Sequence, residues 1–258
     1  MKSHAYSTKY YSLAGKSSAT IGDHPGLIEL KKLCHQSKQI LDFGCGEGSR
    51  LNALLKKNQK GTGVDINDYA ISQARKKYPR HKFMHYDGKK LPFPDENFDL
   101  VYSAFVLEHT QSPELAIEEM IRVLASNGKL VLICPNFGAP NRRSPNSTEN
   151  PVFKLIRGIF KDFFPPSPDH LHWCSVTPKK TYNQPDDDTT VEPYLGTLKR
   201  FLVNKHFKID NSSSLWSEDL PTRNPRKLLF NNLGQNGIFP FSLYGPQAFI
   251  SATKLEAI

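Results

Sequence analysis

The chain has 258 residues, of which 38% are hydrophobic and 23% charged, and its formal net charge is +9 at pH 7. This composition is typical of a folded globular protein with a sizeable core, and no apolar run is long enough to predict a membrane span. The excess charge is spread evenly, with 19 Lys and Arg against 14 Asp and Glu in residues 1–137 and 15 against 11 in residues 138–258. An even spread does not indicate a clustered nucleic-acid-binding face.

Residues 1–37 are predicted to form an N-terminal helical and cap segment. Apolar residues at helical spacing follow Pro25 and Gly26 and predict a helix packed near a sheet. Tyr10 and Tyr11 could cover a bound ligand or pack on the surface, and we favour packing. The start of the chain lacks a signal-type apolar core, and its four cysteines lie far apart without a C-x-x-C pair. These features favour reduced thiols in a cytoplasmic protein.

The run QILDFGCGEGSR, residues 39–50, predicts a buried strand, a glycine turn and the start of a helix. Glycines 44, 46 and 48 would let a ligand lie against bare main chain, at the place where open α/β sheets bind nucleotide-like molecules. A tight turn alone would also use glycines. Asp42 and Glu47 would repel a pyrophosphate but suit a cationic group, so the loop favours an adenosyl ligand without phosphates.

Two more predicted strands end in acidic residues. Residues 62–66 close with Asp65, 17 residues after Gly48, near the position where βαβ units place a carboxylate over a ribose. Capping of the next helix is the alternative for Asp65, although Asn67 or Asp68 could cap it instead. Residues 82–86 are followed by Asp87, which could accept a hydrogen bond from an adenine amine.

Five motifs in order now support a resemblance. They are LDFGCGEG, GVDIN, DGKKLPFPDENFDLV, SAFVLEH and EEMIRVLASNGKLVL. Over about residues 38–137 the chain resembles class I S-adenosylmethionine-dependent methyltransferases, of the branch that acts on small molecules. The resemblance implies S-adenosylmethionine as the cofactor.

The resemblance also assigns the parts of that cofactor to successive strand ends. The loop from Asp42 to Gly48 would hold the methionyl part and Asp65 the ribose, with Ile66 against the adenine. Asp87 and Gly88 would bracket the adenine edge, and Ser103 would lie under the methionyl part. The candidate cofactor-binding residues are Asp42, Gly44, Gly46, Gly48, Asp65, Ile66, Asp87, Gly88 and Ser103.

Glu108 and His109 follow the fourth predicted strand. A histidine can take a proton from a hydroxyl whose oxygen attacks the methyl group, so His109 is the candidate catalytic base and a candidate substrate contact. Because the resembling family has a histidine here across different chemistries, a structural or water-ordering role is the alternative.

Beyond residue 137 the composition changes. A polar, proline-punctuated loop over 138–147 is placed to shape a substrate pocket. Residues 152–164 predict an amphipathic helix whose apolar face includes Ile156, Phe160 and Phe163. This helix could be a lid docked over the site, a helix resting on a membrane surface, or an oligomer contact. We favour the lid, so any membrane contact would be peripheral through 152–164.

His170 and His172 alternate as on a strand, and His170 is the preferred second substrate contact. The triplet at 186–188, Asp-Asp-Asp, has no calcium-loop spacing and predicts a solvated loop. No metal site is predicted.

Taken together, the order of elements predicts an α/β fold, a Rossmann-like, seven-stranded, mostly parallel sheet with helices on both faces. The resemblance adds an antiparallel last strand. A cap lobe would come from late insertions, including an ordered stretch over 215–244. The predicted divisions are 1–37, a cofactor-binding core over 38–137, and 138–258 with the cap insertions and the last helix and strands.

We therefore expect an enzyme that moves a methyl group from S-adenosylmethionine to a small-molecule acceptor. The expected acceptor atom is an oxygen of a sugar, a lipid-linked intermediate or a secondary metabolite. Two alternatives stay open, an RNA-modifying methyltransferase and a cofactor-binding scaffold without catalysis. A nucleic-acid partner is not expected, and the sequence does not indicate an oligomeric state.

Overall fold

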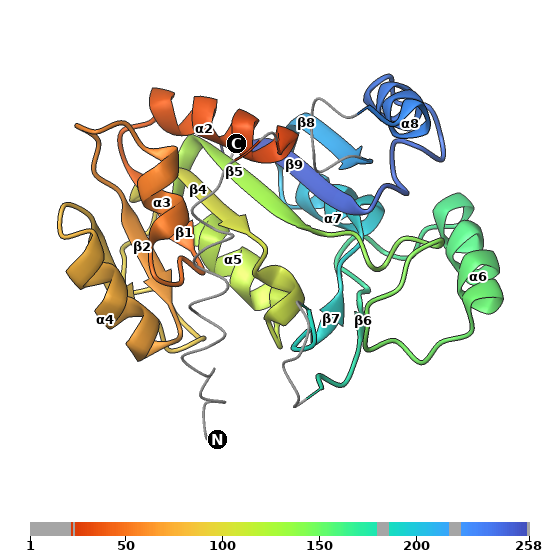
Figure 1. Cartoon of the computed structure of the whole chain (residues 1–258), viewed down its shortest axis with the longest axis horizontal. Helices are drawn as coiled ribbons and strands as arrows, with labels where there is room; N and C mark the ends of the chain where they lie inside the picture. The colour runs from red at the N-terminus through yellow and green to blue at the C-terminus, as the bar shows by residue number, and fades with distance from the viewer. Residues whose placement is uncertain (1–21, 23, 180–185, 217–222, 257–258) are drawn as a thin grey trace.

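The computed structural model of the protein describes residues 22, 24–179, 186–216 and 223–256 (Figure 1). Tyr10 and Tyr11, with most of the predicted segment 1–37, lie outside the described residues. The structure therefore does not test the roles expected for these two tyrosines.

A seven-stranded sheet forms the centre of the molecule, in the order β3-β2-β1-β4-β5-β9-β8. The first five strands in this order run parallel, while β9 runs antiparallel to both of its neighbours. The prediction of a mostly parallel sheet with an antiparallel last strand is confirmed. The strands are β1 (Ile40–Phe43), β2 (Thr62–Asp65), β3 (Lys82–His85), β4 (Phe98–Ala104), β5 (Leu124–Pro135), β8 (Phe207–Leu215) and β9 (Gln247–Lys254).

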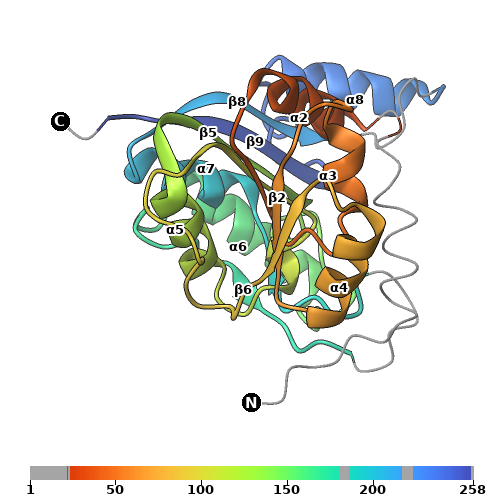
Figure 2. The ribbon, with the colours of Figure 1, turned by 90° about the vertical axis from the view of Figure 1, so that its left-hand side faces the viewer.

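Helices cover both faces of this sheet (Figures 1 and 2). One face packs against α2, α3 and α4 through residues such as Leu30, Leu51 and Ile71. The other packs against α5 and α7 through residues such as Ile117 and Leu198. The helices of these two layers are α2 (Pro25–Gln36), α3 (Ser49–Leu54), α4 (Asp68–Lys77), α5 (Pro113–Val123) and α7 (Leu195–Asn204).

The strands alternate their side chains between these two layers, as buried parallel strands do. On β5, Leu130 and Leu132 face the α5 and α7 layer, while Val131 and Ile133 face the α2, α3 and α4 layer. This double burial explains the near-continuous apolar run of the strand. The helix predicted to start after the glycine turn is α3, which ends at Leu54.

The late insertions add α6 (Pro151–Phe163), α8 (Pro225–Gln235) and a two-stranded sheet of β6 (Cys174–Ser175) and β7 (Val191–Glu192). His170 and His172 precede β6 and are not on a strand. Asn136 is buried at the end of β5, where its amide donates to Leu243 O and Gly245 O at 2.6 and 2.8 Å. Its oxygen accepts from Leu195 N, so one side chain ties the insertion and α7 to the end of the sheet.

Among the helices that the structure describes, none combines the length and the apolar character needed to cross a bilayer.

Candidate functional site

The glycine loop after β1 has a backbone that only glycine adopts easily. Gly44, Gly46 and Gly48 have φ angles of 80°, 52° and 78°, in the left-handed region that a Cβ disfavours. A Cβ on Gly44 would lie 2.4 Å from a methyl of Val106, which follows β4. The loop therefore approaches the β4 end closely, and Gly44 N and Cys45 N both donate to Val64 O on β2.

Asp65, at the end of β2, closes onto this loop. Its Oδ2 accepts from Gly46 N at 2.8 Å and its Oδ1 from Asn67 N at 2.9 Å. Asn67, through its own side chain, caps α4 by accepting from Ala70 N, so the alternative of Asp65 as the helix cap is wrong. Each carboxylate oxygen has a second lone pair, which leaves Asp65 able to accept from a ribose hydroxyl.

Asp42 lies inside β1 and is almost fully buried. Burial raises the pKa of Asp42 to about 7, against the opposing charge of Arg50. Arg50 also donates to Ala104 O at 2.7 Å and so joins the start of α3 to the end of β4. Burial likewise raises the pKa of Asp65 above its ordinary value, while the amides of Gly46 and Asn67 lower it. Asp42, which is buried, and Asp65, which is half-buried, thus flank the loop.

The ends of β2 and β3 present the residues expected at the adenine. Ile66 follows Asp65 and is 53% exposed, which is unusual for an isoleucine next to a core strand. Asp87 is exposed beyond β3, and its Oδ1 accepts from Lys89 N and Lys90 N. Gly88 has a φ of 82° with open space around it. These residues lie at the same edge of the sheet as Asp65, since Asp65 pairs with His85 in the β2–β3 register.

Ser103, by contrast, is fully buried within β4. Its hydroxyl has no hydrogen-bond partner among the described residues. The structure therefore brings the loop and Asp65 into direct contact. It places Ser103 within β4, next to Tyr102, which pairs with Asp42 of β1.

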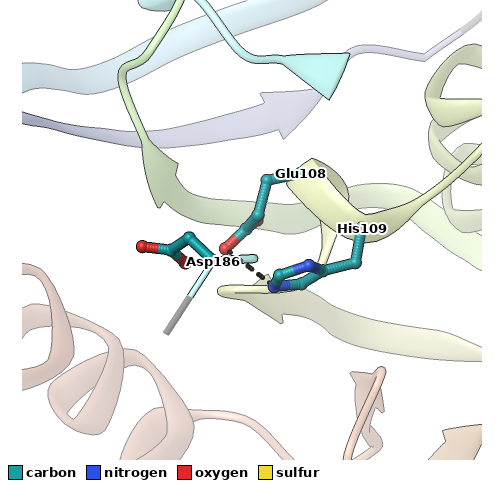
Figure 3. A group of neighbouring side chains, drawn as sticks. All are labelled: Glu108, His109 and Asp186. Carbon is teal, nitrogen blue, oxygen red and sulfur yellow. Dashed lines mark ion pairs between the residues drawn. The ribbon is translucent and has the colours of Figure 1, made fainter. Parts of the chain in front are cut away.

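A cluster of charged side chains includes Glu108 and His109, which follow Val106 in the chain (Figure 3). Glu108 and His109 form η1 (Leu107–His109), and the His109 Nε2 lies 3.7 Å from Glu108 Oε1. The His109 Nδ1 lies 3.1 Å from Asp188 Oδ1. Thr190 N donates to Glu108 O at 2.8 Å and holds the segment that contains Asp188 against η1.

The expectation of a solvated loop at 186–188 is wrong for two of its three residues. Asp187 and Asp188 are each 4% exposed, because the segment folds against η1 and β7 instead of extending into solvent. No local pattern indicates this contact, since some eighty residues separate His109 from Asp188.

Burial and the neighbouring charges shift the pKa values of both His109 and Glu108. Burial lowers the pKa of His109, but the carboxylates of Asp188, Glu108 and Asp186 outweigh it and raise that pKa to about 9. Burial raises the pKa of Glu108 to about 7, while His109 opposes that shift. A raised pKa favours the imidazolium form of His109 at neutral pH. Glu108, His109 and Asp186 also bring one nitrogen and two carboxylate oxygens within 4.8 Å of one another, an arrangement that could hold a divalent cation.

His170 contacts residues outside this cluster. Its side chain is 66% exposed and pairs with Glu114 of α5 at 3.1 Å, while Leu171 N donates to the other oxygen of Glu114. The His172 ring bonds to Ser167 O. In these contacts both histidines hold the segment after α6 rather than joining His109.

Sequence reasoning also missed a buried ion pair that fixes α6. Lys154 bonds to Glu192 of β7, and both side chains are almost completely buried. Lys154 also donates to Phe137 O at 2.9 Å, and Glu192 accepts from Ser144 N. The pattern of apolar and charged residues in α6 does not indicate which side of the helix packs on the protein. The inward orientation of Lys154 follows only from its pairing with Glu192, 38 residues later in the chain.

The chain is similar to known methyltransferases. Residues 41–132 match the family model described as a methyltransferase domain. A probable S-adenosylmethionine-dependent methyltransferase of Mycobacterium tuberculosis is 31% identical over 111 residues, which are 42% of this chain and 40% of that protein. The ajmaline N-methyltransferase of Rauvolfia serpentina is 27% identical over 205 residues, covering 71% of this chain and 70% of that enzyme.

A putative 23S rRNA (guanine-N(1)-)-methyltransferase of Bacillus subtilis is 37% identical over 114 residues, covering 42% of this chain and 38% of that protein. The chain spans about two fifths of the length of the mycobacterial relative that it matches. Among solved structures, an S-adenosylmethionine-dependent methyltransferase from Aquifex aeolicus superposes with a TM-score of 0.56 at 13% identity, over 97% of this chain and all of that one. That likeness shows the fold.

Proposed function

Because the core of this chain belongs to the class I S-adenosylmethionine-dependent methyltransferase family, we propose that the protein transfers a methyl group to an oxygen of a small-molecule acceptor. The acceptor classes that we favour are a sugar, a lipid-linked intermediate and a secondary metabolite. The observation that carries the proposal is the contact between the glycine loop and Asp65, beside an exposed Ile66.

The residues at this sheet edge fit S-adenosylmethionine. The positive φ angles of Gly44 and Gly46 turn the loop sharply and present main chain without side chains to a ligand. Asp65 keeps lone pairs for a ribose diol, and the exposed face of Ile66 offers an apolar surface to an adenine. The acids beside the loop suit the cofactor's cationic groups. When bound, the cofactor supplies an electrophilic methyl group on a sulfonium.

His109 is the proposed catalytic residue on the acceptor side. It lies three residues beyond Val106, whose side chain meets the glycine loop. In its neutral form His109 can accept the proton of the acceptor hydroxyl as the new carbon–oxygen bond forms. Since its pKa is raised to about 9, that role favours alkaline pH. The same ring, when charged, can orient an acceptor oxygen by donating a hydrogen bond. His170, which pairs with Glu114 of α5, is retained as a proposed substrate contact.

An RNA acceptor is the second candidate, because a putative rRNA methyltransferase is among the relatives and the chain carries a net charge of +9. This alternative predicts RNA binding that weakens steeply as salt is raised. A scaffold that binds the cofactor without turnover is the third candidate.

The experiment is to incubate purified protein with methyl-labelled S-adenosylmethionine and a fractionated cell extract, and to follow the label by mass spectrometry. We expect label in a small-molecule or lipid fraction. Label in the RNA fraction would support the second candidate. Cofactor binding measured by calorimetry, without label in any fraction, would support the scaffold. A protein that binds no cofactor would refute all three.

A further inference from the structure

Helix α6 turns its apolar side chains to solvent, although it belongs to the folded body of the protein. Seven apolar residues on and next to this helix are between 38% and 68% exposed. Isolated exposed apolar residues are common on protein surfaces, but a contiguous group of this size marks an interaction site. The seven residues are Val152, Phe153, Leu155, Ile156, Phe160, Phe163 and Phe164.

The polar side of α6 is the side that packs on the protein. Lys154 is buried against Glu192 and Phe137 O. Asp162, the last but one residue of the helix, accepts from the hydroxyls of Tyr194 and Tyr244. These contacts fix the orientation of the helix, with its apolar face outward. A lid docked through that apolar face, which the sequence favoured, is therefore not what the structure shows.

The apolar surface continues beyond α6. The ring of Phe163 lies 6.0 Å from that of Phe239, and Phe239 and Ile238 are themselves 47% and 46% exposed. Leu228 and Leu229 of α8 are also exposed. In Figure 1, α6 and α8 lie on the same side of the molecule, away from α3 and α4. We call the seven exposed apolar residues named above, together with Ile238 and Phe239, the apolar platform.

The charges around the apolar platform are mostly basic. Residues 138–169 and 223–246 contain eight Lys and Arg but only three Asp and Glu. Two of the eight are paired with acids, Lys154 with Glu192 and Arg157 with Glu149. All three acids have partners, since Glu149 pairs with Arg157, Asp162 accepts from two tyrosines and Asp169 bonds to Ser167 and Asn204. Arg226 and Lys227 are exposed at the start of α8.

An apolar face with basic flanks and engaged acids is complementary to an anionic lipid surface. Phenylalanines enter the boundary between headgroups and acyl chains, and Lys and Arg bind the anionic headgroups. A second copy of the chain is a poorer occupant, because a two-fold contact would place the same basic groups opposite one another. Charge complementarity thus selects the bilayer over self-association.

We propose that the apolar platform docks the protein on the surface of an anionic lipid bilayer, with α6 lying in the interface and Arg226 and Lys227 against the headgroups. This docking does not depend on the proposed methyl transfer. Together with it, docking would bring lipid-linked acceptors to the protein.

Co-sedimentation with vesicles tests the proposal. We expect the full chain to sediment with vesicles of equal parts phosphatidylglycerol and phosphatidylcholine, and much less with pure phosphatidylcholine. The triple variant Phe153→Ser/Ile156→Ser/Phe160→Ser should lower the partition coefficient by about tenfold or more. Arg226→Gln/Lys227→Gln should lower it by about fivefold for each charge, roughly 25-fold for the pair, and only for anionic vesicles.

Leu115→Ser is the matched control, because Leu115 is a single apolar residue that is 58% exposed on α5, and binding should not change. Thermal melts establish that each variant is folded. If the folded wild type stays in the supernatant with anionic vesicles, the proposal is refuted. It is equally refuted if analytical ultracentrifugation finds a wild-type dimer that the triple variant converts to a monomer while neither binds vesicles. Neither readout uses methyl transfer, so the two proposals fail separately.

Discussion

The amide of Gly46 donates a hydrogen bond of 2.8 Å to Oδ2 of Asp65. One carboxylate at the end of β2 therefore shapes the glycine loop after β1, in addition to the ribose contact that we propose for it. The two elements of the site are coupled, because a change in Asp65 alters the loop as well as the ligand contact.

Asp65→Ala should raise the dissociation constant of S-adenosylmethionine by at least about tenfold. It removes a charged acceptor for the ribose, and hydrogen bonds to charged groups contribute about 1.5–3 kcal/mol each. Calorimetry on the purified variant measures the change. Asp68→Ala is the control, since the Asp68 side chain is 85% exposed on the first turn of α4. Equal affinity of the Asp65 variant and wild type would remove Asp65 from the site.

Gly44→Ala should destabilise the protein by roughly 2–4 kcal/mol, as the sum of left-handed backbone strain and overpacking. The new Cβ would meet Val106 at 2.4 Å. Gly237→Ala separates the two causes, because Gly237 has a φ of 74° with no heavy atom near its Cβ position, so that variant has the strain alone. Urea unfolding measures both. If Gly44→Ala costs no more than Gly237→Ala, the close approach is not a constraint on stability.

The predicted fold agrees with the structure because its signals are local. The apolar run of β5 and the glycines after β1 determine strand, turn and helix within a few residues. The contacts that hold the insertions in place are not local. The pairing of His109 with Asp188, and of Lys154 with Glu192, depends on how the insertions fold back.

Helix α6 shows the same limit in another form. The period of its apolar residues predicts the helix correctly, and the structure begins and ends it within one residue of 152–164. Periodicity defines two faces without stating which one packs on the protein. The inward choice comes from Lys154, Asp162 and their distant partners.

If His109 is the base, methyl transfer should increase as the pH rises toward about 9, because the ring accepts a proton only when neutral and its pKa is raised to about 9. Asp188→Asn removes the charge that raises this pKa, so the rising limb should move to lower pH. Initial rates measured over about four pH units, from about pH 6 to about pH 10, determine the position of the rising limb. Asp169→Asn, a change at an exposed carboxylate, is the control. A limb that stays in place in the Asp188 variant would assign it to another group.

The same cluster gives a stability prediction of defined sign. A histidine whose pKa is raised on folding contributes stability that is fully present below its unfolded pKa, about 6.5, and is lost as the pH rises through about 9. His109→Gln should therefore flatten the fall in melting temperature over that interval. Burial of the ring reduces the size of the effect without changing its sign. An unchanged slope in the variant would contradict the raised pKa.

We expect a chelator to leave methyl transfer unchanged. The described residues offer three ligand atoms at Glu108, His109 and Asp186, but the imidazolium of His109 already supplies a positive charge among these acids. Activity and melting temperature before and after dialysis against EDTA test this expectation. Loss of activity that Mn²⁺ restores in wild type, and does not restore in Glu108→Gln, would show that this cluster holds a metal ion.

Lys154→Met should lower the free energy of unfolding by about 3–5 kcal/mol, because it leaves the carboxylate of Glu192 buried without its cation. The Lys154 and Glu192 side chains are 3% and 1% exposed, so solvent cannot replace the lost partner. Lys154→Met/Glu192→Gln removes both charges and should recover most of the loss. Lys32→Met is the control, since Lys32 is 65% exposed in its ion pair with Glu29, and its effect should stay within about 0.5 kcal/mol. Urea unfolding of the four proteins measures these differences. A double variant as unstable as Lys154→Met would mean that the bond from Lys154 to Phe137 O, rather than the uncompensated charge, holds α6 in place.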